Sequence, residues 1–326
     1  FNGNGYVISN LTINEPTKLC QGLFGCVDNA TFTNVGLENV DIKGRSYSGA
    51  LIGRGGHISV SNCYSAGNVA GEEAVGGLVG ISFSGVVTNC YSACNVKGEY
   101  RIGGLIGLND RAKVSNCYAS GSVTGKKCCG GLMGNSASGP SNCYATGNVV
   151  GEENVGGLLG RSFYLFSNCY ATGNVIGTIN VGGLVGICES YGFDGCYSIG
   201  SVAGKENVGG LIGYNKTASS TAIIKNSYSL SKVTGEVNIG ALIGYLESVT
   251  KIENISYNTS INPSLTAIGY NKASIDETLI KNDFPIPKIP VLPNVITFQI
   301  GIASDDSSQM SFDLEFTLDL SIEISD

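Results

Sequence analysis

Short runs of apolar and small residues alternate with glycines along most of the chain, in a cassette that recurs every 26 to 31 residues. One early copy covers residues 58–64, 68–71 and 75–80, with three to six β-favouring residues between successive glycines. Runs of this length and composition are typical of short strands. The apolar spacing of an amphipathic helix is not sustained over three turns anywhere. The pattern therefore predicts an all-β fold.

A fixed period of this size predicts a solenoid, in which each repeat forms one turn that stacks on the next. We expect each turn to hold about three short strands, each paired in parallel with the same strand of the neighbouring turn. The prediction is a parallel β-solenoid (β-helix) of about nine coils over residues 1–262. Such a molecule is extended and suits display or contact more than catalysis around one pocket.

Equivalent residues of the cassette should stack into ladders of identical side chains. An asparagine at a corner can cap its own backbone and bond to the next amide, whereas the leucines should supply core. The asparagine ladder is predicted at Asn62, Asn89, Asn116, Asn142 and Asn168. The tyrosine ladder is predicted at Tyr64, Tyr91, Tyr118, Tyr144, Tyr170 and Tyr197. The leucine ladder is predicted at Leu78, Leu105, Leu132, Leu158, Leu184 and Leu211.

The cysteines form a fourth ladder, at Cys63, Cys90, Cys117, Cys143, Cys169 and Cys196. Their spacing of about 4.8 Å would permit disulfides, but parallel strands point the thiols in one direction. Ser227 occupies the same place in a later copy, so the position accepts a small residue without a partner. We expect buried free thiols there. Cys20 and Cys26 could pair, and the redox compartment stays open.

The pattern changes after the repeats. Five prolines between residues 263 and 294 predict a stiff, extended connector that cannot join a central sheet. In residues 295–326, apolar side chains alternate with polar and acidic ones on both sides of a polar turn at 304–309. This alternation predicts an antiparallel β-hairpin with one apolar face. Such a hairpin is marginal alone, so its apolar face should pack against another surface.

Charge excludes several classes of function. Only 14% of residues are charged, and the net charge of −7 gives no basic footprint for nucleic acid. No apolar run approaches the roughly 18 residues of a membrane helix, so we expect no membrane insertion. The chain begins at Phe1 without a Met, and we expect it to be a piece of a longer exported protein.

Candidate chemistry is sparse. Most charge lies in one variable turn of the cassette, where Lys126 and Lys127 fall between acidic residues of neighbouring copies. Ion pairing between coils is favoured over a catalytic carboxylate pair, which only adjacency would support. His57 is the sole histidine, so it can build neither a catalytic triad nor a histidine-based zinc site. We expect no catalytic site, no metal, no cofactor and no enzyme activity.

The repeated Val-Gly-Gly-Leu-x-Gly, as in residues 75–80, resembles the GLUG repeat, and the likeness covers about residues 1–260. That family occurs in bacterial surface proteins, including adhesins and a non-catalytic region of a secreted metalloprotease. The resemblance implies a solenoid stalk or binding region and no particular chemistry.

Residues 297–301 and 310–313 resemble the segment of bacterial flagellins where the variable outer region returns to the conserved helical core. That likeness implies the outer, hypervariable domain of a large flagellin, at the flagellum or cell surface, self-assembling with identical subunits. The twelve cysteines depart from it, because flagellins are usually poor in cysteine. The alternative hypothesis is an adhesin-type solenoid that binds glycan or a host surface through its tyrosine or turn ladders.

Overall fold

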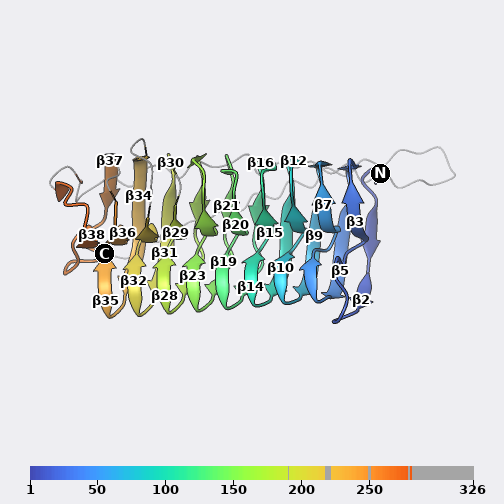
Figure 1. Ribbon diagram of the computed structural model, residues 1–326, viewed down its shortest axis with the longest axis horizontal. Helices are drawn as coiled ribbons and strands as arrows, with labels where there is room; N and C mark the ends of the chain where they lie inside the picture. Colours follow the sequence, from blue (N-terminus) through green and yellow to red (C-terminus); the bar gives the residue numbers. More distant parts are fainter. Residues whose placement is uncertain (190, 217–221, 249–250, 278–279, 281–326) are drawn as a thin grey trace, which may run out of the picture. The chain divides into compact units, whose positions relative to one another are not determined.

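The computed structural model describes residues 1–189, 191–216, 222–248, 251–277 and 280. These residues form 38 strands and no α-helix, as the sequence predicts. The chain divides into two units, Phe1–Leu292 and Pro293–Asp326, and the second lies outside the described residues together with the predicted hairpin. Figure 1 shows the turns of the first unit side by side in sequence order.

Four sheets run along the stack. Sheet A has 16 strands: β1 (Val7–Ser9), β2 (Thr12–Asn14), β5 (Gly36–Lys43), β9 (Tyr64–Ala70), β13 (Tyr91–Lys97), β17 (Tyr118–Ala119), β18 (Val123–Thr124), β21 (Tyr144–Ala145), β22 (Val149–Val150), β25 (Phe166–Ser167), β26 (Tyr170–Ala171), β27 (Val175–Ile176), β30 (Gly192–Asp194), β31 (Tyr197–Ala203), β34 (Ile223–Thr234) and β37 (Lys251–Tyr257). Sheet B has eight: β6 (Ser46–Ser48), β10 (Glu73–Gly76), β14 (Tyr100–Gly103), β19 (Lys127–Gly130), β23 (Glu153–Gly156), β28 (Ile179–Gly182), β32 (Glu206–Gly209) and β35 (Val237–Gly240).

Sheet C has ten strands: β3 (Phe24–Asp28), β7 (Ile52–Gly56), β11 (Val79–Ser82), β15 (Ile106–Asn109), β20 (Met133–Ser136), β24 (Leu159–Ser162), β29 (Val185–Cys188), β33 (Ile212–Asn215), β36 (Ile243–Leu246) and β38 (Ile268–Asn271). Sheet D has four: β4 (Thr31–Thr33), β8 (Ile58–Ser61), β12 (Gly85–Thr88) and β16 (Lys113–Ser115). One turn passes through sheets D, A, B and C in order, as β8 to β11 do. Each strand then pairs in parallel with its equivalent one turn on, as β9 does with β13.

Sheet C shows that the stack has ten turns, one more than the sequence analysis counted. The additional strand is β38, which pairs in register with β36 through Ile243 and Ile268. Its sequence, Ile-Gly-Tyr-Asn, keeps the end of the cassette but lacks the glycine pair before it, which hides the copy. Sheet C therefore continues into the segment expected to be the proline-rich connector.

The core lies inside the turns and is built from apolar residues that recur in each turn, both in the strands and in the bends between them. In the middle of the stack Val155, Leu158 and Leu159 are all fully buried, and so is Val149 from sheet A. Strands of three or four residues bury little each, but parallel stacking joins these positions into one continuous cluster. The buried side chains of the core therefore recur with the same period as the cassette in the sequence.

The glycines of the motif mark places where backbones meet. A Cβ atom on Gly157 would overlap the carbonyl oxygen of Gly183 in the next turn. One on Gly160 would lie 2.5 Å from the carbonyl carbon of Cys128, in the preceding turn. No side chain fits at such distances, so only glycine lets the turns stack at Gly157 and lets sheets B and C approach one another at Gly160. The Gly-Gly-Leu-x-Gly spacing is therefore a packing requirement of the turn.

Candidate functional site

The tyrosine ladder lies on the outer side of sheet A. Tyr64, Tyr91, Tyr118, Tyr144, Tyr170, Tyr197 and Tyr228 stack one above another, with ring centroids 4.7–4.9 Å apart and interplanar angles of at most 6°. The rings are half-buried, except for that of Tyr197, which is buried. At the first end the ring of Tyr64 covers Gly36, and its hydroxyl donates to Glu38 at 3.0 Å. The neighbouring tyrosines therefore occupy most of the ring faces of the ladder.

Burial raises the pKa of the stacked phenols, because a phenolate would lose solvation there. The pKa of Tyr64 rises to about 12 through burial, helped by Glu38, and that of Tyr170 to about 12 through burial. The pKa values of Tyr144 and Tyr197 rise further, because burial is joined by repulsion between neighbouring phenolates. An unfolded tyrosine releases its proton near pH 10, so the folded state keeps protons that the unfolded state loses.

We therefore expect the contribution of the tyrosines to stability to be constant below about pH 10 and to fall as the pH rises from there towards 12. Urea unfolding at a series of alkaline pH values, with phenolate absorbance as a second signal, measures this loss. Tyr144→Phe removes one titrating group and should make the loss shallower. A stability that stays level up to pH 12 would contradict the burial of these hydroxyls.

The cysteine ladder points into the core. Cys63, Cys90, Cys117, Cys143, Cys169 and Cys196 are at most 1% exposed, and all six are free thiols. Each thiol donates to the carbonyl two residues before it, as Cys117 does to Ser115 at 3.1 Å, and Cys143 Sγ accepts from the N–H of Cys117. Ser227 takes the same place and accepts from the N–H of Cys196 at 3.0 Å. Cys20 and Cys26 form a disulfide, with Cα atoms 5.7 Å apart.

Burial also raises the pKa of the Cys90, Cys117, Cys143 and Cys169 thiols, so reactive thiolate is scarce at these positions. We expect none of the ten free cysteines to react with a water-soluble thiol reagent in the folded protein. After denaturation without reductant, all ten should react. Mass spectrometry of the labelled protein counts the modified sites. Rapid labelling of ladder cysteines under native conditions would show that the turns open readily.

The predicted asparagine ladder lies at the exposed corner between sheets D and A. Asn62, Asn89, Asn116, Asn142 and Asn168 adopt left-handed backbone angles near +53°, and each side-chain amide donates to the asparagine one turn earlier. The ladder is interrupted at Gly195, where Asn226 donates instead to the carboxylate of Asp194 at 2.8 Å. The leucine ladder, Leu78, Leu105, Leu132, Leu158, Leu184 and Leu211, is buried throughout.

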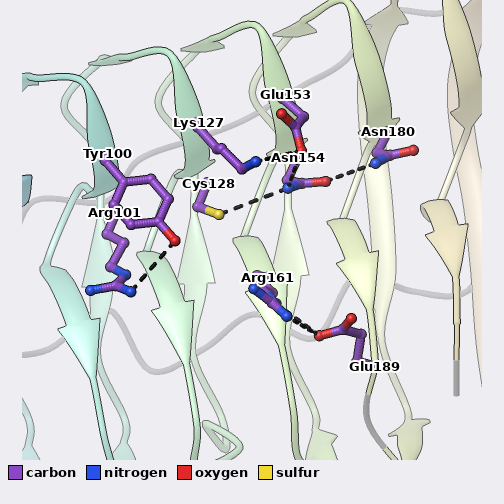
Figure 2. A network of polar contacts seen from close by, with 9 residues as sticks. All are labelled: Tyr100, Arg101, Lys127, Cys128, Glu153, Asn154, Arg161, Asn180 and Glu189. Atoms are coloured by element: carbon purple, nitrogen blue, oxygen red, sulfur yellow. Dashed lines mark hydrogen bonds and ion pairs between the residues drawn. The ribbon is translucent and has the colours of Figure 1, made fainter. Parts of the chain in front are cut away.

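A second asparagine ladder, which the sequence analysis missed, lies in sheet B. Asn154, Asn180 and Asn207 are 4–8% exposed, and Asn238 follows them. Asn180 donates to Asn154, Asn207 to Asn180 and Asn238 to Asn207, each at 2.8 Å. Figure 2 shows Asn154 between Cys128 and Asn180, with Cys128 holding the equivalent place one turn earlier. The signal in the sequence was the recurring Asn two residues before Gly-Gly or Gly-Ala.

Replacing a buried ladder asparagine should lower the free energy of unfolding more than replacing an exposed one. Asn180 and Asn142 both have positive φ, so changing each to Gly keeps the backbone conformation and removes only the amide. Asn180→Gly leaves a buried donor on Asn207 without its acceptor, and we expect a loss of about 2 kcal/mol in unfolding free energy. Asn142→Gly should lose less than about 1 kcal/mol. Urea titrations of both variants measure the difference, and equal losses would contradict it.

The variable turn carries ion pairs between coils. Lys126 lies 2.6 Å from Glu99, and Lys127 lies 2.9 Å from Glu153. These side chains are about half exposed, so such pairs contribute little to stability. His57 is exposed and contacts Asp28 at 3.2 Å. On sheet C, Arg161 pairs with Glu189, and its guanidinium lies over the ring of Phe163 (Figure 2 shows the ion pair).

The described part of the chain holds no group of three His, Cys, Asp or Glu side chains arranged to hold a metal ion. It also contains no helix long and apolar enough to cross a membrane. No curated protein and no solved structure matches the chain. Residues 98–124 and 151–176 match the GLUG motif. These two stretches are equivalent parts of different turns, and the chain is accordingly a parallel β-solenoid that carries the GLUG motif, a fold that suits a structural or surface domain.

Proposed function

We propose that the chain is a non-enzymatic structural domain displayed outside a bacterial cell, as the outer domain of a filament of the flagellin type. The observation that carries this proposal is the use of the repeated side chains. The asparagines and tyrosines of the cassette each contact their own equivalents in the next turn, and the leucines all belong to one continuous core. Side chains used in this way build a stiff stack and leave few groups for chemistry.

Two sequence features support the filament in particular. Residues 297–301 and 310–313 resemble the return of a flagellin's outer region to its helical core. The low content of charge and the net charge of −7 suit a surface that meets solvent and other subunits rather than nucleic acid. Identical subunits in a filament are the partners that the proposal requires.

Electron microscopy of surface filaments tests the proposal. Cells producing the full-length protein are compared with cells whose protein lacks the turns of residues 26–257. We expect filaments with outer projections in the first strain and thinner, smooth filaments in the second. Smooth filaments in both strains, with the protein found in the medium or outer membrane, would overturn the filament assignment.

The second candidate is an adhesin that binds glycan. Ladder tyrosines offer few free ring faces, but Tyr164 and Tyr191, in loops of adjacent turns, are 51% and 47% exposed, with centroids 6.1 Å apart. Exposed aromatic rings are suited to stacking on sugars. A glycan array distinguishes the candidates: saturable binding lost in Tyr164→Ala but retained in Tyr144→Phe favours the adhesin. If the chain binds no glycan on the array, the filament role is the remaining candidate.

A further inference from the structure

The outer face of sheet A is free of charge over three consecutive turns. Residues 115–124, 141–150 and 167–176 include no Asp, Glu, Lys or Arg. Their outward side chains are Ser, Thr, Asn and Tyr, together with Val150 and Ile176, which are 41% and 51% exposed. We call the outward side chains of these three ranges the neutral face.

Charge is placed on other sides of the same turns. The ion pairs of Lys126 with Glu99 and of Lys127 with Glu153 lie at sheet B and the turn before it. Arg161 and Glu189 lie at sheet C. Burying a charged side chain between two copies without a partner costs free energy, and this cost is absent where neither copy presents charge. The neutral face is therefore the side on which two copies can approach most closely.

The chemistry of the neutral face is also complementary to itself. The side-chain oxygens of Asn148 and Asn174 accept from backbone N–H groups one turn later, at 2.9 and 3.0 Å. Their Nδ2 groups have no hydrogen-bond partner among the described residues and lie on exposed side chains. Hydroxyls of residues such as Thr146 can accept from these donors. Protein interfaces are enriched in Tyr and depleted of charge at their centre, as here.

We propose that the neutral face binds the neutral face of a second copy in a two-fold contact. Such an interface requires one patch that complements itself, and both copies carry the same spacing of turns, so their side chains can interdigitate in register. Val150 and Ile176 supply apolar area beside the amides and hydroxyls. In a filament, this contact would join neighbouring outer domains side by side. In this respect the inference rests on the proposed function.

Single introduced cysteines test the contact on the intact chain, because all ten native free thiols are buried. Asn148→Cys places a thiol in the middle turn of the neutral face. Ile179→Cys, the control, places one on sheet B, where Ile179 is 38% exposed. A copper–phenanthroline oxidant removes two electrons from two thiols, which release two protons and form one disulfide. We expect a disulfide-linked dimer with Asn148→Cys and little or none with Ile179→Cys.

Sedimentation at several protein concentrations provides the second measurement and needs no added thiol. The unmodified chain should dimerise, and the double variant Thr146→Lys, Asn148→Lys should weaken the dimer at least tenfold, because it sets four cations against one another. Ile179→Lys should leave it unchanged. Circular dichroism checks that all variants fold.

A chain that stays monomeric at every concentration would overturn the proposal, and so would equal weakening by Ile179→Lys. Retention of a monomeric chain on insoluble polysaccharide, lost in the double variant, would also overturn it and assign the face to a glycan. Filaments with outer projections but no dimer would refute the contact and leave the filament role standing. Smooth filaments with an intact dimer would refute only the filament role.

Discussion

Leu158→Asp is expected to unfold the middle of the stack. Leu158 is fully buried, its N–H donates to Leu184 at 2.9 Å, and its carbonyl accepts from Leu132 at 2.9 Å. A carboxyl group there has no partner and must either be buried charged or take up a proton, at a cost of about 4 kcal/mol or more. Because the turns share one core, the loss should spread to neighbouring turns.

Thermal melting and urea titration, followed by circular dichroism, measure the effect. Leu165→Asp provides the matched control, since Leu165 belongs to the same turn and is 49% exposed. It should change the unfolding free energy by less than about 0.5 kcal/mol. An unchanged melting curve for Leu158→Asp would mean that the leucine ladder does not form the core.

Gly157→Ala is expected to have the next largest effect, although it adds a single methyl group. That methyl would overlap the carbonyl oxygen of Gly183 and lie 2.9 Å from the Cβ of Ala171. The oxygen belongs to the backbone of the next turn, so relief requires moving that whole turn. We expect a loss of about 3 kcal/mol or more, at the upper end for overpacking.

Gly71→Ala is the comparison for Gly157→Ala in urea titrations. Its added methyl would come no closer than 3.0 Å to Arg45 and Val75, the second through a side chain that can shift. Its loss should therefore be clearly smaller. Similar losses in both variants would attribute the effect to the general cost of replacing glycine rather than to contact between turns.

The period of the cassette was enough to predict the solenoid and its parallel pairing, because identical side chains must meet when identical turns stack. The period also identified the positions of the ladder leucines and cysteines, which lie in the bends between strands and are buried there. The sequence did not predict whether the tyrosines point into the core or outwards, since a ring that ends up half-buried is compatible with either direction. Sheets B and C pack through glycine contacts between different turns, which no single cassette displays.

The second asparagine ladder was hidden for a physical reason. Its corner has positive φ in every full copy, but Ala74, Arg101 and Cys128 occupy it in the first three. Neighbouring turns can therefore hold a residue in this conformation without the side chain that favours it. Only from Asn154 onwards is this position an asparagine, the residue type that indicates positive φ in a sequence. The ten turns were undercounted for a similar reason, since β38 keeps the pairing but loses the glycine pair.

Both asparagine ladders donate in one direction, always from a later turn to an earlier one, as Asn142 does to Asn116 and Asn207 does to Asn180. The amide dipoles therefore point the same way along the stack and polarise one another, as peptide dipoles do in an α-helix. Each column is electrically polar, with its N–H ends towards the first turn and its oxygens towards the last. The break at Gly195 divides the exposed column into two shorter dipoles, and the carboxylate of Asp194 accepts from the first amide of the second.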